Sequence, residues 1–109
     1  MSHYKSNLRD LRFNLFEVFG ADKVLGTGPF GDLDVDTANS ILDEVDRLAR
    51  EDLGASYAIA DRTPPVFDPK THTAPLPAEF KDSYRALMAS EFWRMDLPAE
   101  IGGTPAPRG

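Results

Sequence analysis

The chain has 109 residues, of which 41% are hydrophobic and 28% charged, and its formal net charge is -6. This composition is typical of one soluble globular domain, and the acidic balance argues against nucleic acid, whose phosphates are bound by Lys and Arg. The complete lack of cysteine excludes disulfides, thiolate nucleophiles and Cys-ligated metals.

A first helix of about twelve residues is predicted between Asn7 and Gly20. Asn7 can accept a backbone N–H as an N-cap, and Gly20 suits the position just past the last turn. Apolar residues cover more than one side of this stretch, which predicts that the helix is sandwiched between other parts of the protein. An alternative is a short extended run over Arg12 to Leu15, where Phe and Leu alternate with polar residues. The polar residues before the helix do not resemble a secretory signal, and no apolar run approaches the roughly 18 residues of a membrane span, so we expect a cytoplasmic protein.

Residues 21–35 carry several glycines and one proline and are predicted to form a loop. A long amphipathic helix should follow from Asp36 to Asp61, capped by Asp34 or Asp36 and bent near Gly54. Its apolar residues fall within an arc of roughly 140° on a helical wheel, and its outer side pairs Asp43 with Arg47 at i,i+4. A helix of about 35 Å needs partners along most of its length. The rest of this chain offers too few, so we expect part of a larger helical domain.

The central helix is stopped by Pro64 and Pro65, and residues 66–73 have turn chemistry that predicts a small hairpin or hooked loop. Pro77 opens a last helix that we expect to run to about Arg94. The tail from Met95 has no period. The predicted fold class is all-α, with about three helices joined by long Pro/Gly-rich loops.

Two motifs match known binding loops only in part. Gly26, Gly28 and Gly31 fit GxGxxG, but no strand precedes them and Pro29 removes one of the amides that would bind phosphate, so we interpret the stretch as a plain loop. The aspartates at 32, 34 and 36 begin like a calcium loop. Thr37 stands where that loop needs glycine, and we interpret the aspartates as the N-cap region of the long helix.

The remaining candidates for chemistry are isolated residues. His3 and His72 have no partner at metal-ligand spacing. Asp52 lies within the apolar arc and would have a raised pKa if buried, and we favour its pairing with an Arg of a neighbouring element over catalysis. Ser56 is a second polar residue in that arc. We therefore assign no catalytic, cofactor-binding or metal residues.

An apolar cluster lies near the end of the chain and finishes in a di-glycine. Such glycines let another backbone or a flat cofactor approach closely, so the cluster either lines a ligand or partner surface or is simply packed. The sequence favours neither interpretation. The cluster comprises Phe92, Trp93, Met95, Leu97 and Ile101, followed by Gly102 and Gly103.

Four segments in order resemble the N-terminal part of acyl-CoA dehydrogenases. They are Tyr4 to Phe13, the acidic helix ending in Asp61-Arg62, Leu76-Pro77-x-x-Phe80-Lys81, and Leu97-Pro-x-Glu100-Ile-Gly102-Gly103. Residues 4–24 and 66–72 further resemble a bacterial branch with an N-terminal extension. This resemblance implies two parts, an extension over residues 1–25 and the beginning of the N-terminal helical domain over residues 26–109.

The family consists of FAD-dependent flavoenzymes of fatty acid oxidation, with β and C-terminal helical domains after the helical one. The resemblance implies that the glutamate base, most flavin contacts and the CoA-facing residues lie in those other domains, which would be this chain's partners, and that the complete enzyme is a homo-oligomer. No glutamate here matches the base, neither Glu17, Glu44, Glu51, Glu79, Glu91 nor Glu100. Glu91 stands where relatives commonly carry a small residue, usually Gly.

We therefore predict a helical portion of an acyl-CoA dehydrogenase that is inactive by itself. The alternative is a small helical module that binds a partner protein on its uncovered apolar face.

Overall fold

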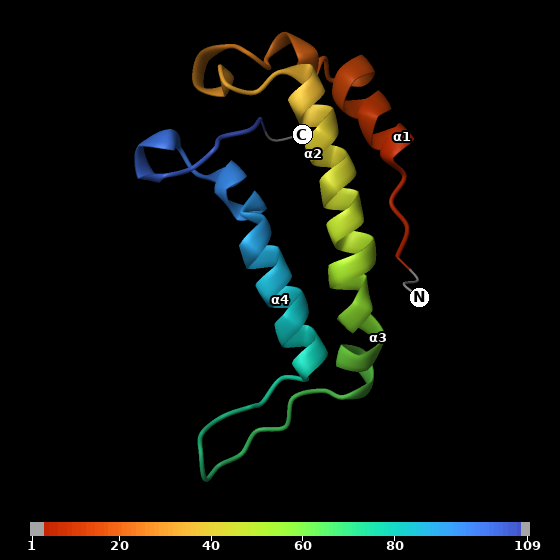
Figure 1. Cartoon of the computed structure of the whole chain (residues 1–109), viewed down its shortest axis with the longest axis vertical. Helices are drawn as coiled ribbons and strands as arrows, with labels where there is room; N and C mark the ends of the chain where they lie inside the picture. Colours follow the sequence, from red (N-terminus) through yellow and green to blue (C-terminus); the bar gives the residue numbers. More distant parts are fainter. Residues whose placement is uncertain (1–3, 108–109) are drawn as a thin grey trace. The chain divides into compact units, whose positions relative to one another are not determined.

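A computed structural model describes residues 4–107 of the chain, in which helices are the only extended regular elements, so the all-α prediction is confirmed. The four α-helices are α1 (Leu8–Arg12), α2 (Val35–Arg47), α3 (Gly54–Arg62) and α4 (Ala78–Ser90) (Figure 1). The residues divide into two compact units, one of residues 4–5 and 47–90 and one of residues 6–46 and 91–107. None of the helices in this part of the chain combines the length and apolarity needed to cross a membrane.

The first predicted helix is present but changes its winding. Asp10 N donates to Asn7 Oδ1 at 3.2 Å, so Asn7 is the predicted N-cap. The α-helix α1 passes at Phe13 into a π-helical turn, Phe13–Val18, and Gly20 follows in the left-handed region with φ 62°. The extended alternative for residues 12–15 is therefore wrong. The widened turn spreads Phe and Leu side chains around the segment, where Leu15 and Phe16 are half-buried.

The predicted central helix consists of α2, a π-helical segment Leu48–Leu53 and α3. Asp34 is the cap, because its carboxylate accepts the amide of Thr37 at 2.7 Å. That backbone hydrogen bond, with a further one from the Thr37 side chain, holds the pKa of Asp34 below its usual value. The irregular winding ends at Gly54, which is where we predicted the helix to bend.

The first unit is built from α3 and α4 together with the π-helical segment. Leu48 is the buried apolar side chain here, with 4% of its surface exposed. Beside it, two buried serines meet across the helices: Ser83 Oγ of α4 donates to the Asp52 carbonyl oxygen at 2.6 Å and lies 2.8 Å from Ser56 Oγ. Ser56 is thus satisfied in the interior, as a buried hydroxyl must be.

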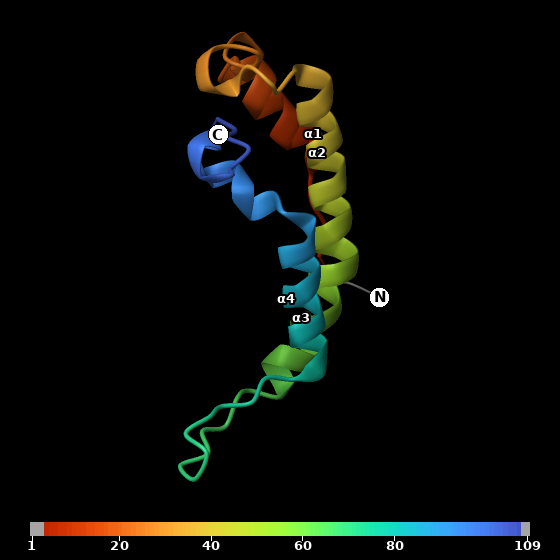
Figure 2. The same ribbon diagram turned by 60° about the vertical axis from the view of Figure 1, so that its left-hand side comes forward.

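Residues 63–77 form a long loop between the ends of α3 and α4 (Figure 2). Asp68 and Thr73 form an isolated antiparallel bridge, in which the Asp68 amide donates to the Thr73 carbonyl oxygen at 2.7 Å. Asp68 Oδ1 accepts the Lys70 amide, and His72 takes φ 53° to close the turn. The predicted small hairpin is confirmed, reduced to a single bridge.

Helix α4 ends at Ser90, four residues before the predicted end. Glu91 has φ 61° and ψ 10°, the left-handed conformation that ends helices. The chain continues as a 3₁₀ turn, Phe92–Asp96, and later a second, Ala99–Ile101. The predicted end at Arg94 is therefore wrong, because the helical spacing of Phe80, Tyr84 and Met88 does not reveal a positive φ at Glu91.

Candidate functional site

The terminal turn, defined as residues 91–106, is held together by the side chain of Arg94. Its Nη1 donates to the Gly102 carbonyl oxygen at 3.0 Å, and its Nη2 lies 3.4 Å from Glu91 Oε1. The guanidinium also lies 5.0 Å from the ring centroid of Trp93. One positive group therefore connects the residue that ends α4 with the di-glycine.

Gly103 is required by a close approach of the chain to itself, and Gly102 by its φ of 88°. A Cβ on Gly103 would collide with the Leu97 carbonyl oxygen. The amides of Thr104 and Ala106 then donate to the carbonyl oxygens of Arg94 and Met95, at 3.0 and 3.1 Å. The predicted backbone approach is present, and the approaching backbone is the chain's own.

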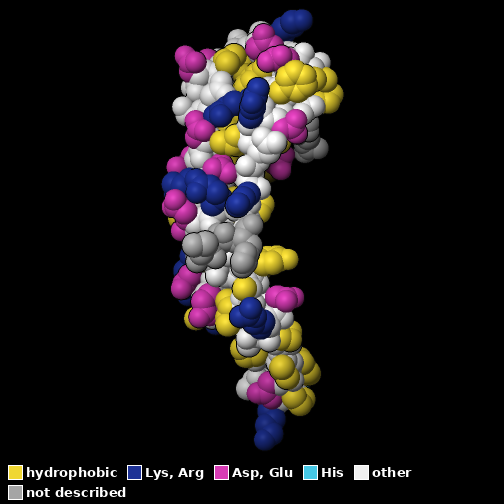
Figure 3. Space-filling view, turned by 90° about the vertical axis from the view of Figure 1, so that its right-hand side faces the viewer, with side chains coloured by type: hydrophobic (Ala, Val, Ile, Leu, Met, Phe, Trp, Pro, Cys, Tyr) yellow, Lys and Arg dark blue, Asp and Glu magenta, His cyan; other side chains and the backbone are white. Residues whose placement is uncertain are grey.

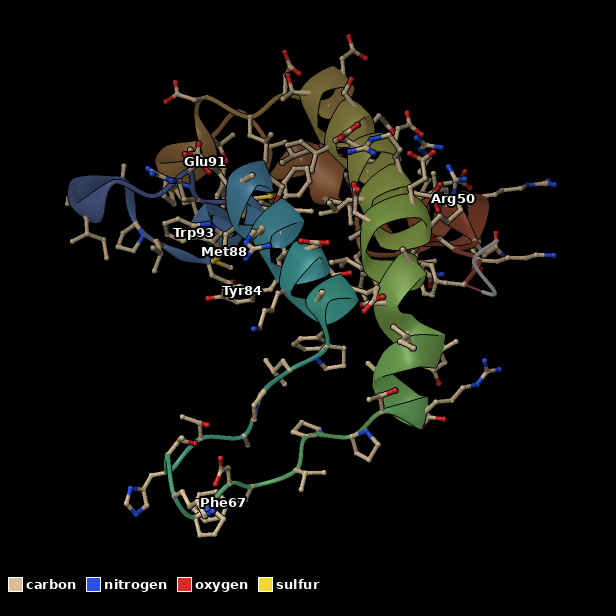
Figure 4. All side chains as sticks on the ribbon, turned by 60° about the horizontal axis from the view of Figure 1, so that its bottom comes forward. Arg50, Phe67, Tyr84, Met88, Glu91 and Trp93 are labelled. Carbon is tan, nitrogen blue, oxygen red and sulfur yellow. The ribbon has the colours of Figure 1, made fainter. Side chains whose placement is uncertain are left out.

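The apolar cluster of this turn is packed on one side and open on the other. Phe92, Met95 and Leu97 are half-buried, whereas Trp93 is 43% and Ile101 67% exposed. Glu91 and Trp93 both belong to the turn that follows α4 (Figure 4). Packing explains the first three residues, and the last two leave an apolar surface for a partner or ligand.

The aspartate motif spans the start of α2, where Asp34 is the cap and Asp36 lies in the first turn, whereas the glycine motif lies in a loop. Gly26 and Gly28 take φ 78° and 50°, so glycine is needed there for the turns themselves, and a 3₁₀ turn with Pro29 follows in place of the helix that a nucleotide phosphate requires. The loop over residues 26–31 therefore does not fit the pyrophosphate of FAD. Among residues 4–107, no group of three or more His, Cys, Asp or Glu side chains is arranged to hold a metal.

The isolated candidate residues that the structure describes, His72 and Asp52, are not brought together into one site. His72 is exposed in the hairpin loop, and His3 lies outside the described residues. Asp52 Oδ2 pairs with Arg47 Nη1 at 3.2 Å, and the same nitrogen lies 3.1 Å from Glu51 Oε2. The predicted pairing of Asp52 with an arginine is present, and Arg47 is the last residue of α2, directly before the π-helical segment that contains Asp52.

Large apolar side chains are exposed over both units. On the predicted apolar face Leu48 is buried, but Ile41 is only half-buried and Val45 is 39% exposed. In the hairpin loop Val66 is 75% and Phe67 60% exposed, and Phe67 lies away from α3 and α4 (Figure 4). Figure 3 shows such apolar side chains between charged ones on one face of the molecule. The remaining large apolar side chains that are exposed among the described residues are Tyr4, Leu11, Phe13, Val18, Phe19, Val24, Val35, Tyr57, Leu76, Phe80, Tyr84, Trp93 and Ile101.

Three polar residues with important contacts were missed from the sequence. Arg12, Ser83 and Arg94 each join segments that are distant in the chain or reverse its direction. Ser83 carried a usable signal, since a small polar residue within an amphipathic helix suggests a close helix contact. The arginines carried none, because charged residues on helices are usually solvated.

The comparisons with known proteins give one close relative. No family model matches the chain. The chain is 51% identical over 108 residues, 99% of its length, to the broad-specificity linear acyl-CoA dehydrogenase FadE5 of Mycobacterium tuberculosis. The match spans only 18% of that relative's length. The predicted resemblance is thereby confirmed, and it supports correspondence to the N-terminal part of such an enzyme.

Proposed function

Because this sequence is homologous to part of an acyl-CoA dehydrogenase over nearly its whole length, we propose that the chain is the N-terminal helical portion of such an enzyme. The complete protein would be an FAD-dependent oxidoreductase that removes the α and β hydrogens of linear acyl-CoA thioesters. The single observation that supports this proposal is the 51% identity. The cytoplasmic location stays a prediction from the sequence.

Within that enzyme, the role of the chain would be to pack helices against the other domains. This proposal is supported by the exposed apolar side chains described above, since 109 residues could otherwise bury a larger core of their own. The partners would be a β domain and a C-terminal helical domain, and the complete enzyme would be a homo-oligomer. We propose that residues 1–25 are an extension and that residues 26–109 begin the helical domain.

Chemistry would come from the other domains. The glycine loop, residues 26–31, does not fit the flavin pyrophosphate. His72 is exposed in the hairpin loop, and Asp52 pairs with Arg47. The chain alone is therefore expected to lack dehydrogenase activity and tight FAD binding.

A chimaeric enzyme tests the proposal directly. The matched segment of the mycobacterial relative is replaced by this chain, and FAD content and acyl-CoA oxidation with a dye acceptor are measured beside the parent enzyme and a deletion of the segment. The chimaera should retain flavin and activity, whereas the deletion should lose both. A chimaera as inactive as the deletion would contradict the proposal.

The alternative, a helical interaction module, rests on the same exposed apolar surface. Light scattering and thermal melting of the purified chain separate the two proposals. A monodisperse, cooperatively melting chain favours the module, and aggregation or molten behaviour favours a portion of a larger enzyme.

A further inference from the structure

The N-terminal helix is joined to α2 by one guanidinium group. Arg12 Nε donates to Asn39 Oδ1 at 2.8 Å, and its Nη2 donates to the Asn39 carbonyl oxygen at 3.3 Å and to Asp43 Oδ1 at 2.7 Å. All three residues lie in the second unit, and the two views show α1 beside α2 (Figures 1 and 2). One side chain thus joins Arg12 to residues that follow it by 27 and 31 positions, Asn39 and Asp43.

We propose that the face of α2 bearing Asn39 and Asp43 is a docking surface for residues 8–18, and that Arg12 is the positioning residue that fixes this segment. The N-terminal segment is then an integral part of the helical domain and not a loose appendage. This inference stands on contacts within the chain and does not depend on the proposed enzymatic function.

The chemistry of the contact requires arginine. A guanidinium presents donors on a rigid planar fork, so one group can satisfy a side-chain amide, a backbone carbonyl and a carboxylate at once. Lysine would retain the charge but offer a single ammonium, which cannot reproduce the separate Nε and Nη2 directions. Only the Asp43 contact is an ion pair, so high salt should weaken the docking partly and leave the Asn39 bonds in place.

The apolar contribution of the segment to docking is limited. Leu15 and Phe16 are half-buried, but Leu11, Phe13, Val18 and Phe19 are 45–71% exposed. With so much apolar surface still in water, the three polar contacts carry a large share of the attachment. The Arg12 side chain is 33% and that of Asp43 63% exposed, so the ion pair is partly screened by solvent.

Amide hydrogen exchange of the 109-residue chain, read by mass spectrometry over residues 8–19, tests the proposal. Arg12→Gln should raise exchange in this segment by about tenfold, since hydrogen bonds to a charged group are lost. Arg9→Gln removes the same charge from an exposed position on the same helix and is the matched control. Arg12→Lys should raise amide exchange over residues 8–19 nearly as much as Arg12→Gln does. Asp43→Asn should raise it less.

Two results would overturn the inference. The first is equal exchange in Arg12→Gln and Arg9→Gln, which would mean that the specific contacts of Arg12 add no protection. The second is an unprotected segment in the unmodified chain while residues 36–46 of α2 are protected, which would show that the segment is not docked. Wild-type protection of residues 36–46 in both variants confirms that the second unit has folded.

Discussion

Replacing Glu91 by glycine should stabilise the chain. Glu91 has φ 61° and ψ 10°, and a non-glycine residue in the left-handed region costs about 1 kcal/mol or more. The substitution also removes the ion pair with Arg94, whose atoms lie 3.4 Å apart and whose side chains are 36% and 61% exposed. A surface pair of this kind contributes about 0–0.5 kcal/mol after solvent screening. The net effect is a gain of about 0.5–1 kcal/mol.

Glu91→Ala separates conformation from charge, because it loses the ion pair but keeps a Cβ. We expect the glycine variant to be about 1 kcal/mol more stable than the alanine variant, the reverse of the order inside a helix. Ala89→Gly, within the last turn of α4, is the matched control and should destabilise. Urea unfolding followed by circular dichroism measures all three. If Glu91→Ala proves at least as stable as Glu91→Gly, the left-handed conformation at Glu91 is refuted.

Three other predictions concern a close backbone approach, a serine contact between helices and a helix cap. Gly103→Ala should cost about 2–3 kcal/mol in urea unfolding, because its Cβ collides with the Leu97 carbonyl, whereas Gly26→Ala, with open space around it, should cost about 1 kcal/mol. Ser83→Ala should cost about 1–2 kcal/mol, since the Asp52 carbonyl and Ser56 Oγ each lose one hydrogen bond, and exposed Ser40→Ala should change little. For Asp34, the folded pKa is depressed, so its capping contribution is complete above the unfolded pKa and is lost as pH falls through the folded one. Carboxyl NMR titration should give a midpoint below that of an ordinary aspartate.

Each of these can fail clearly. Equal costs for the two glycine variants would remove the argument from close approach, and a neutral Ser83→Ala would mean that the serine contact contributes nothing net. An ordinary titration midpoint for Asp34 would contradict its role as a cap.

Local chemistry predicted the helix boundaries where a cap or a proline marks them, and missed the end of α4. Asn7 and Asp34 were identifiable as caps because short polar side chains before apolar periodicity have few other uses, and Pro64-Pro65 left the central helix no way to continue. Glu91 shows the opposite case. Nothing in a glutamate indicates a positive φ, and only the family resemblance, with its usual glycine there, drew attention to the position.

The contacts around the candidate site were harder to predict from the sequence. Whether Trp93 and Ile101 would be covered depends on tertiary contacts that the apolar pattern does not encode, and the pattern is the same for Phe92, which is half-buried. The contacts of Arg12 with Asn39 and Asp43 join segments separated by a loop whose path no local rule fixes. The functional assignment came from the four segments that resemble acyl-CoA dehydrogenases and then from the 51% identity, and not from any contact in the candidate site.

The π-helical segment Leu48–Leu53 determines which way the side chains of α3 face. A π turn accommodates one residue more than an α turn, as if a single residue had been inserted into a regular helix. If the same residues were wound as a regular α-helix, the extra residue would rotate α3 by about 100° relative to the present arrangement. Ser56 would then turn away from Ser83, so the meeting of the two serines depends on the winding of a stretch to which neither belongs.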